Sequence, residues 1–169
     1  MSFKTEPGQP LRGLATYLPD EYSIVFVRDE EDPHGLGLGR EFLDGALEFG
    51  TLTLTVRGDD GRVAFPEGYH PAVAWHEGPL VVPAAMPGVL YWEPVEDLVK
   101  GGALGIAKVS EVATTSDPST GWIVLRRAAE DTTPHAGLAA VEFCEGVIAE
   151  LDGSRLVSLW MLLRSASRN

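Results

Sequence analysis

The chain has 169 residues, of which 44% are hydrophobic and 22% charged, and its formal net charge is −12. This length and composition are typical of one globular domain that folds without a disulfide or a metal, and they exclude collagen, a coiled coil and wholesale disorder. A strongly negative chain repels nucleic acids and anionic membranes, so we expect neither as a partner.

Cysteine usage and the first residues bear on the compartment. Cys144 is the single cysteine, so no disulfide can form within the chain, and a reducing compartment suits it. Residues 1–13 are polar, contain two prolines and do not have the pattern of a signal peptide. The longest nearly apolar run, residues 156–163, is shorter than the roughly 20 residues that span a bilayer. We therefore expect a cytoplasmic protein.

The first half of the chain predicts short strands behind a loose start. Residues 1–20 mix proline, glycine and polar side chains, which indicates a flexible N-terminal arm ahead of a single domain over residues 21–169. Residues 22–27 are rich in β-branched and aromatic side chains and predict a strand. Residues 40–50 place apolar side chains on one helical face, so a short helix is expected there. Residues 51–56 alternate threonine with Leu or Val, which predicts a half-buried strand and a hairpin back to residues 62–65.

The second half continues this pattern. Further strands are expected near residues 72–77, 89–93, 103–113 and 122–126, with a helical turn after Pro94. Residues 134–163 allow two interpretations. Apolar spacing of three and four residues over 138–151 favours a helix, whereas alternation on both sides of Asp152-Gly153 favours a hairpin. We favour the hairpin, because a glycine at position 146 costs a helix about 1 kcal/mol.

These elements predict a mainly β fold. Short strands with turns every 8–15 residues indicate an antiparallel barrel or sandwich of about seven to eight strands with one or two short helices. The alternative is an α+β fold with a curved antiparallel sheet. The sequence does not fix which strand faces point inward.

Motifs for metal binding and nucleophilic catalysis are absent from the sequence. The four histidines form no pair at helical ligand spacing. If a strand joins His70 to His76, the two side chains are roughly 20 Å apart. No serine elbow is present, and the Glu145 carboxylate beside Cys144 disfavours a reactive thiolate. We therefore expect no metal and no cofactor.

Aromatic and titratable residues are concentrated between residues 69 and 93. Aromatic walls, small alanines and a few polar groups are typical of a pocket for a small molecule. A histidine and a carboxylate across a barrel mouth can act as general base and general acid. The expected ligand-binding residues are Tyr69, Trp75, Tyr91 and Trp92, and the expected catalytic pair is His76 as base and Glu93 as acid.

The sequence therefore predicts a β-barrel protein that binds a small hydrophobic or aromatic molecule. A cofactor-independent biosynthetic enzyme, such as a cyclase, isomerase or dehydratase, fits this prediction, although the sequence does not decide whether the protein is an enzyme. The alternative is an acidic interaction protein, of inhibitor or immunity type, that binds a basic protein partner. A homodimer is compatible with either function.

Overall fold

Strands dominate the computed structural model, which describes residues 2–33, 43, 45–98, 102–128 and 137–165. The strands are β1 (Ser2–Pro7), β2 (Gly13–Leu18), β3 (Ser23–Arg28), β4 (Gly45–Phe49), β5 (Leu52–Val56), β6 (Val63–Tyr69), β7 (His76–Glu77), β8 (Met86–Glu93), β9 (Ala103–Ala107), β10 (Val112–Ser116), β11 (Trp122–Arg127), β12 (Ala139–Cys144), β13 (Val147–Asp152) and β14 (Arg155–Ser165). Short 3-10 turns are η3 (Ala72–Ala74), η4 (Val95–Asp97) and η5 (Val109–Glu111). Within these ranges no helix is long and apolar enough to cross a membrane.

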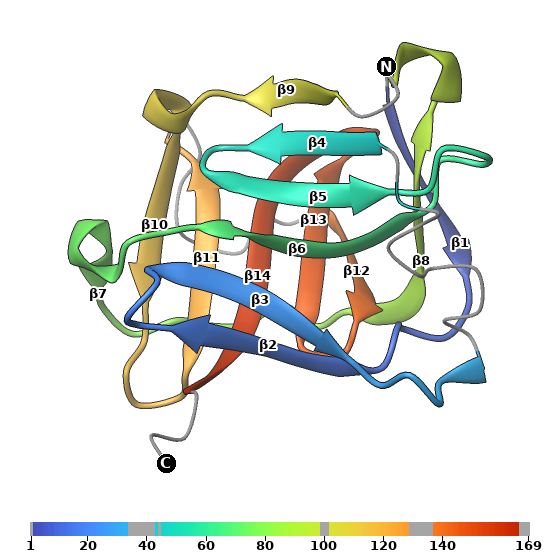
Figure 1. Ribbon diagram of the computed structural model, residues 1–169. Coiled ribbons are helices and arrows are strands. Elements are labelled where there is room, and N and C mark those ends of the chain that lie inside the picture. The colour runs from blue at the N-terminus through green and yellow to red at the C-terminus, as the bar shows by residue number, and fades with distance from the viewer. Residues whose placement is uncertain (1, 34–42, 44, 99–101, 129–136, 166–169) are drawn as a thin grey trace.

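The strands form one curved sheet that bends over itself as a half-barrel (Figure 1). β2, β3, β6, β5, β4 and β9 follow one another across the front of the view, and β11, β14, β13 and β12 run steeply across them behind. β14 links the two layers, because it pairs with β11 and β13 along most of its length and with β2 at residues 163–165. This arrangement resembles orthogonal sheet packing, in which a strand passes from one layer to the next.

The main core lies on the concave side of the sheet, and the alternation in β5 shows how the sequence builds it. Leu52, Leu54 and Val56 are fully buried, whereas Thr53 and Thr55 point to the other side. Each buried leucine contributes on the order of 2 kcal/mol of transfer free energy. The leucine and valine face of this half-buried strand therefore meets the core.

A second, smaller cluster lies on the other side of the steep strands. Val124, Ile148 and Trp160 form its buried part, and side chains from the segment between β7 and β8, including Leu80 and Val82, pack against them. This segment shields part of the outer face of the sheet from water. A buried ion pair lies on the same strands, since Arg126 of β11 and Glu150 of β13 are 3.0 Å apart.

The mainly β prediction is confirmed, but the expected number and direction of strands are corrected. The sheet has 14 strands rather than seven to eight. It is also mixed, because β2 with β14, β4 with β9, β7 with β10 and β8 with β12 run parallel. Short two-residue strands and parallel pairings have no clear signal in sequence alternation. They appear only when distant segments add to an existing edge.

Two local predictions are wrong for a shared reason. Residues 2–7 and 13–18 are strands paired in the sheet rather than a flexible arm. The expected helix over residues 40–50 lies partly outside the described residues, and its described end, Gly45–Phe49, is strand β4. In both places pairing with a distant strand overrides a weak local preference.

The hairpin at the C-terminal end is confirmed. β13 and β14 are antiparallel and are joined by a turn at Gly153 and Ser154. A second turn at Glu145 and Gly146 separates β12 from β13, so the alternating run that the sequence indicates is two strands rather than one. Gly146 has a φ of 68°, a conformation that glycine adopts at little cost.

Candidate functional site

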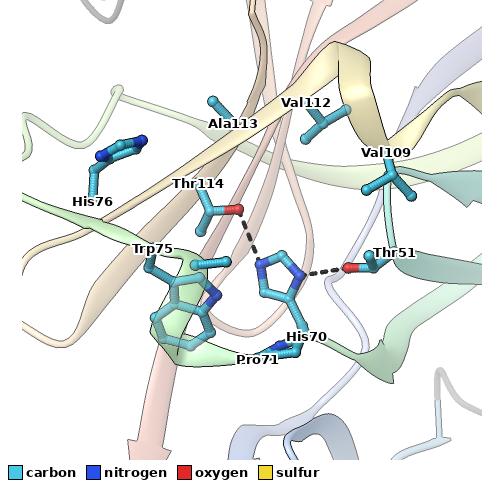
Figure 2. A pocket seen from close by; sticks show the side chains of 11 residues that line it. Thr51, His70, Pro71, Trp75, His76, Val109, Val112, Ala113 and Thr114 are labelled. Carbon is cyan, nitrogen blue, oxygen red and sulfur yellow. Dashed lines mark hydrogen bonds between the residues drawn. The ribbon is translucent and has the colours of Figure 1, made fainter.

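A cavity of about 230 Å³ opens beside His70, where the end of β6, the loop before β7 and β10 meet (Figure 2). The His70 side chain is held from both sides. Its Nδ1 lies 2.5 Å from Thr51 Oγ1, and its Nε2 lies 3.0 Å from Thr114 Oγ1. Figure 2 shows the imidazole between these two hydroxyls. The two hydrogen bonds therefore fix the orientation of the ring.

Burial determines the charge of this ring. His70 is only 7% exposed, and desolvation lowers its pKa to about 4. At neutral pH the imidazole is uncharged, so one nitrogen donates a hydrogen bond and the other accepts one. A threonine hydroxyl can take either role, so the pair of threonines accommodates either tautomer. The centre of the cavity is polar and uncharged.

The turn between β4 and β5 brings Thr51 to this position. Gly50 has a φ of 63°, which a residue with a side chain rarely adopts. A Cβ on Gly50 would also lie 3.2 Å from Cβ of Val112 at the start of β10. Glycine thus lets the turn close tightly against β10. This contact places Thr51 opposite Thr114 across the cavity.

Trp75 forms the aromatic wall of the cavity. The η3 turn precedes it, and its ring centroid lies 5.3 Å from that of His70 and 5.1 Å from that of Tyr17. The Tyr17 hydroxyl accepts a hydrogen bond from the backbone N–H of Ala72, which ties the η3 turn to β2. No acceptor reaches the buried Nε1 of Trp75 in the part of the chain that the structure describes.

The remaining lining is largely apolar. It consists of Gly50, Pro71, Ala74, Val109, Val112 and Ala113, with His76 at the edge. Of the described residues that line it, none is an aspartate, glutamate, lysine or arginine. An ion entering this cavity would lose water without gaining an opposite charge, which is costly. The cavity therefore suits an uncharged molecule.

The structure places two of the predicted site residues, Trp75 and His76, at this cavity. His76 is exposed and lies at its margin in Figure 2. Tyr69 directly precedes His70, but it is 59% exposed and its ring packs near Tyr22 instead. Tyr69 is not among the lining residues.

The other three predicted residues, Tyr91, Trp92 and Glu93, lie on β8, on the opposite side of the view in Figure 1. Trp92 is buried against Phe3, with ring centroids 5.1 Å apart, and lines a different cavity of about 380 Å³. Glu93 lies 3.8 Å from the ammonium of Lys4 on β1. The structure therefore does not bring His76 and Glu93 together as a base and acid pair.

The residues at the centre of the cavity are ones that the sequence prediction does not select. His70 falls in the aromatic-rich stretch. Its position between a strand and a proline is the sequence feature that could indicate a role at a site. Thr51 and Thr114 are 19 and 44 positions from His70 and give no signal of their own. The expected strand over residues 72–77 is replaced by the η3 turn and the two-residue β7. Because of this bend, His70 and His76 line the same cavity instead of lying far apart along a strand.

Among the described residues, no group of three or more histidine, cysteine, aspartate or glutamate side chains is placed to hold a metal ion. Comparison with known proteins adds no identity. No model of a protein family matches the chain, and no curated protein matches it.

Proposed function

We propose that the protein binds a small, uncharged apolar or aromatic molecule in the cavity between His70 and Trp75. The observation that carries the proposal is the enclosure of a neutral, doubly hydrogen-bonded histidine by apolar and aromatic walls. Binding pockets in proteins combine such walls with a few fixed polar groups.

The size of the cavity limits the ligand. A dry cavity of roughly 150 Å³ holds benzene, and this one is about 230 Å³. A single ring with one or two small substituents therefore fits. The Nε1–H of Trp75 lies on the edge of the indole that faces His70 in Figure 2. This nitrogen is buried and has no protein acceptor among the described residues, so it carries the cost of an unsatisfied buried polar group.

The proposal is for binding rather than catalysis. A general base works best when its pKa is near the working pH, whereas His70 has a pKa of about 4. The predicted catalytic pair, His76 and Glu93, lies on separate sides of the molecule. Turnover by a cyclase, isomerase or dehydratase therefore has no support from the geometry of this cavity.

Two matched leucine substitutions test the proposal. Ala74 lines this cavity, whereas Ala72, on the same η3 turn, lines a different one, and both are exposed. Phenol, toluene and indole are titrated into each variant and followed through the indole N–H signals in NMR. We expect dissociation constants of roughly micromolar to millimolar for ligands of this size.

Ala74→Leu fills the cavity, so we expect it to weaken binding by about tenfold or more, which corresponds to a loss of about 1.4 kcal/mol. Ala72→Leu should leave the affinity unchanged. Equal affinity in both variants, or no binding of any of the three probes, would reject the proposal.

A second candidate function is the binding of a basic protein partner. The net charge of −12 supports it, because electrostatic steering accelerates association with an oppositely charged surface. The expected observation is an association rate that falls steeply as salt is added. A salt-independent rate for a captured partner would reject this candidate.

A further inference from the structure

Trp75 also lines a second cavity. This cavity has a volume of about 330 Å³ and lies where β2, β7, β14 and the turn between β10 and β11 meet. Three aromatic residues from different elements line it, namely Tyr17, Trp75 and Trp122. Tyr17 and Trp75 are in contact, with ring centroids 5.1 Å apart. Three aromatic side chains thus border one open cavity.

A fixed negative charge lies in the same lining. Asp117 is 7% exposed, and its carboxylate accepts hydrogen bonds from Ser119 N and Oγ, at 2.9 and 2.6 Å, and from Leu80 N at 3.1 Å. These donors hold the pKa of Asp117 below its usual value, so the group stays ionised. None of the ion pairs found among the described residues includes Asp117.

Two exposed charges flank this cavity. Glu77 of β7 adds a second carboxylate, and Arg164 of β14 adds one positive charge. Among the described residues, the lining therefore carries two negative charges and one positive charge beside three aromatic rings. Such surroundings favour a cation over a neutral molecule or an anion, because aromatic faces and carboxylates both attract positive charge.

We propose that this cavity, lined by Tyr17, Trp75 and Trp122 and bordered by Asp117 and Glu77, is a binding site for a small organic cation such as an alkylated ammonium ion. The proposal goes beyond the function proposed above, because it concerns a different cavity and a ligand of different charge. The methyl groups of such a cation contact the rings, and the positive charge faces the carboxylates. A site of this kind needs no movement of the sheet.

Three probes of similar shape and different charge test the proposal. They are choline, its neutral analogue 3,3-dimethylbutan-1-ol, and the anion 3,3-dimethylbutanoate, each titrated by calorimetry into the full chain. We expect choline to bind at least about fivefold more tightly than the alcohol, the amount expected for a cation–π contact of about 1 kcal/mol. The anion should bind most weakly. Choline that binds no better than the alcohol, or not at all, would overturn the proposal.

Two exposed residues allow the charge dependence to be checked without unfolding the protein. Glu77→Gln should weaken choline binding about two- to fivefold, as for the loss of an exposed ion pair. Arg164→Gln removes a like charge and should strengthen choline binding. Glu96→Gln, an exposed carboxylate on the η4 turn, is the matched control and should change nothing. Unchanged or reversed effects at Glu77 and Arg164 would overturn the proposal.

The leucine variants separate this site from the first. Ala72 lines the second cavity and not the first, whereas Ala74 lines the first and not the second. Ala72→Leu should therefore weaken choline binding and leave phenol binding intact, and Ala74→Leu should do the opposite. If Ala72→Leu leaves choline binding unchanged, this cavity is not the choline site and the proposal fails, whatever the outcome for phenol.

Discussion

The imidazole of His70 and the indole of Trp75 lie with their centroids 5.3 Å apart and their planes inclined by 33°. The loop that follows β6 produces this contact, because Pro71 and the η3 turn fold the chain back within five residues. Both residues line the cavity proposed to bind an uncharged ring. Trp75 also lines the cavity proposed to bind a cation. Trp75 is thus shared by two pockets of different electrostatic character.

The pH dependence of stability should report on His70. Its pKa is about 4 in the folded protein, against 6.5 for an unperturbed histidine. As pH falls below 6.5 the unfolded chain takes up a proton on this side chain, whereas the folded protein does so only near pH 4. The free energy of unfolding therefore decreases as pH falls through this window, by about 3 kcal/mol in total. Above pH 6.5 the group contributes no pH dependence.

Urea denaturation of the wild type and of His70→Gln at pH 7 and pH 4.5 measures this contribution. We expect His70→Gln to lose about 2–3 kcal/mol less than the wild type between these two pH values. The ring C–H signals of His70 in NMR give its pKa directly. If the free energy of unfolding falls equally in the two proteins between these pH values, or if the measured pKa is near 6.5, the imidazole is not desolvated.

The hydroxyl of Thr114 should stabilise the fold through His70. Thr114→Val keeps the shape of the side chain but leaves Nε2 of the buried imidazole without this partner. We expect a loss of about 1–3 kcal/mol in the free energy of unfolding, the cost of an unsatisfied buried polar group. Thr115→Val, on the other face of the same strand, is the matched control. A loss of similar size in both variants would point to strand propensity instead.

The buried ion pair on the outer face of the sheet should be sensitive to removal of one partner. Glu150 accepts hydrogen bonds from Arg126 Nη2 at 3.0 Å, from Trp160 Nε1 at 2.8 Å and from Ser158 Oγ. Glu150→Leu leaves the guanidinium buried without this carboxylate. We expect it to destabilise the protein by about 3–5 kcal/mol in urea denaturation.

The double variant Arg126→Met, Glu150→Leu tests whether charge is the cause. Removing both charges avoids leaving the Arg126 guanidinium buried without the Glu150 carboxylate, so the double variant should be more stable than Glu150→Leu alone. Glu48→Gln, an exposed carboxylate on β4, should change the stability by less than about 0.5 kcal/mol. If the double variant is less stable than Glu150→Leu, packing rather than charge dominates at this position.

Cys144 should be inert in the folded protein. The thiol is fully buried, donates to the carbonyl oxygen of Ala64 at 2.7 Å, and has a pKa raised well above its usual value by desolvation. Because only the thiolate reacts quickly, a disulfide reagent such as Ellman's reagent should label almost no thiol in buffer. It should label one thiol per chain in concentrated urea, since the chain has a single cysteine. Rapid labelling of the folded protein would contradict this burial.

Sequence patterns predict the parts of the fold that rest on local alternation. The hairpin of β5 and β6 follows from alternating threonine and leucine. The turn that begins after Asp152 follows from an Asp-Gly pair between two apolar runs. β1 escapes prediction because only Phe3 among its residues is buried, so its sequence shows no alternation. Its strand conformation depends on pairing with β8, which lies more than 80 positions away in the chain.

The candidate site likewise combines residues that the sequence indicates with residues that only the fold brings together. Composition directs attention to the stretch that contains Trp75, because aromatic residues are concentrated there. The partners of His70 come from a turn and a strand that only the folded sheet brings together. The spacing of His76 and Glu93 says nothing of their distance across the sheet, and they lie on separate strands at opposite sides of the view in Figure 1.

Diffraction from crystals soaked with bromobenzene tests the central claim most directly, since bromine gives an anomalous signal that locates the ring. The account predicts a peak in the cavity between His70, Trp75 and Val112, and no peak there in crystals of Ala74→Leu. An empty cavity in the wild type, with bromine bound elsewhere or not at all, would contradict it.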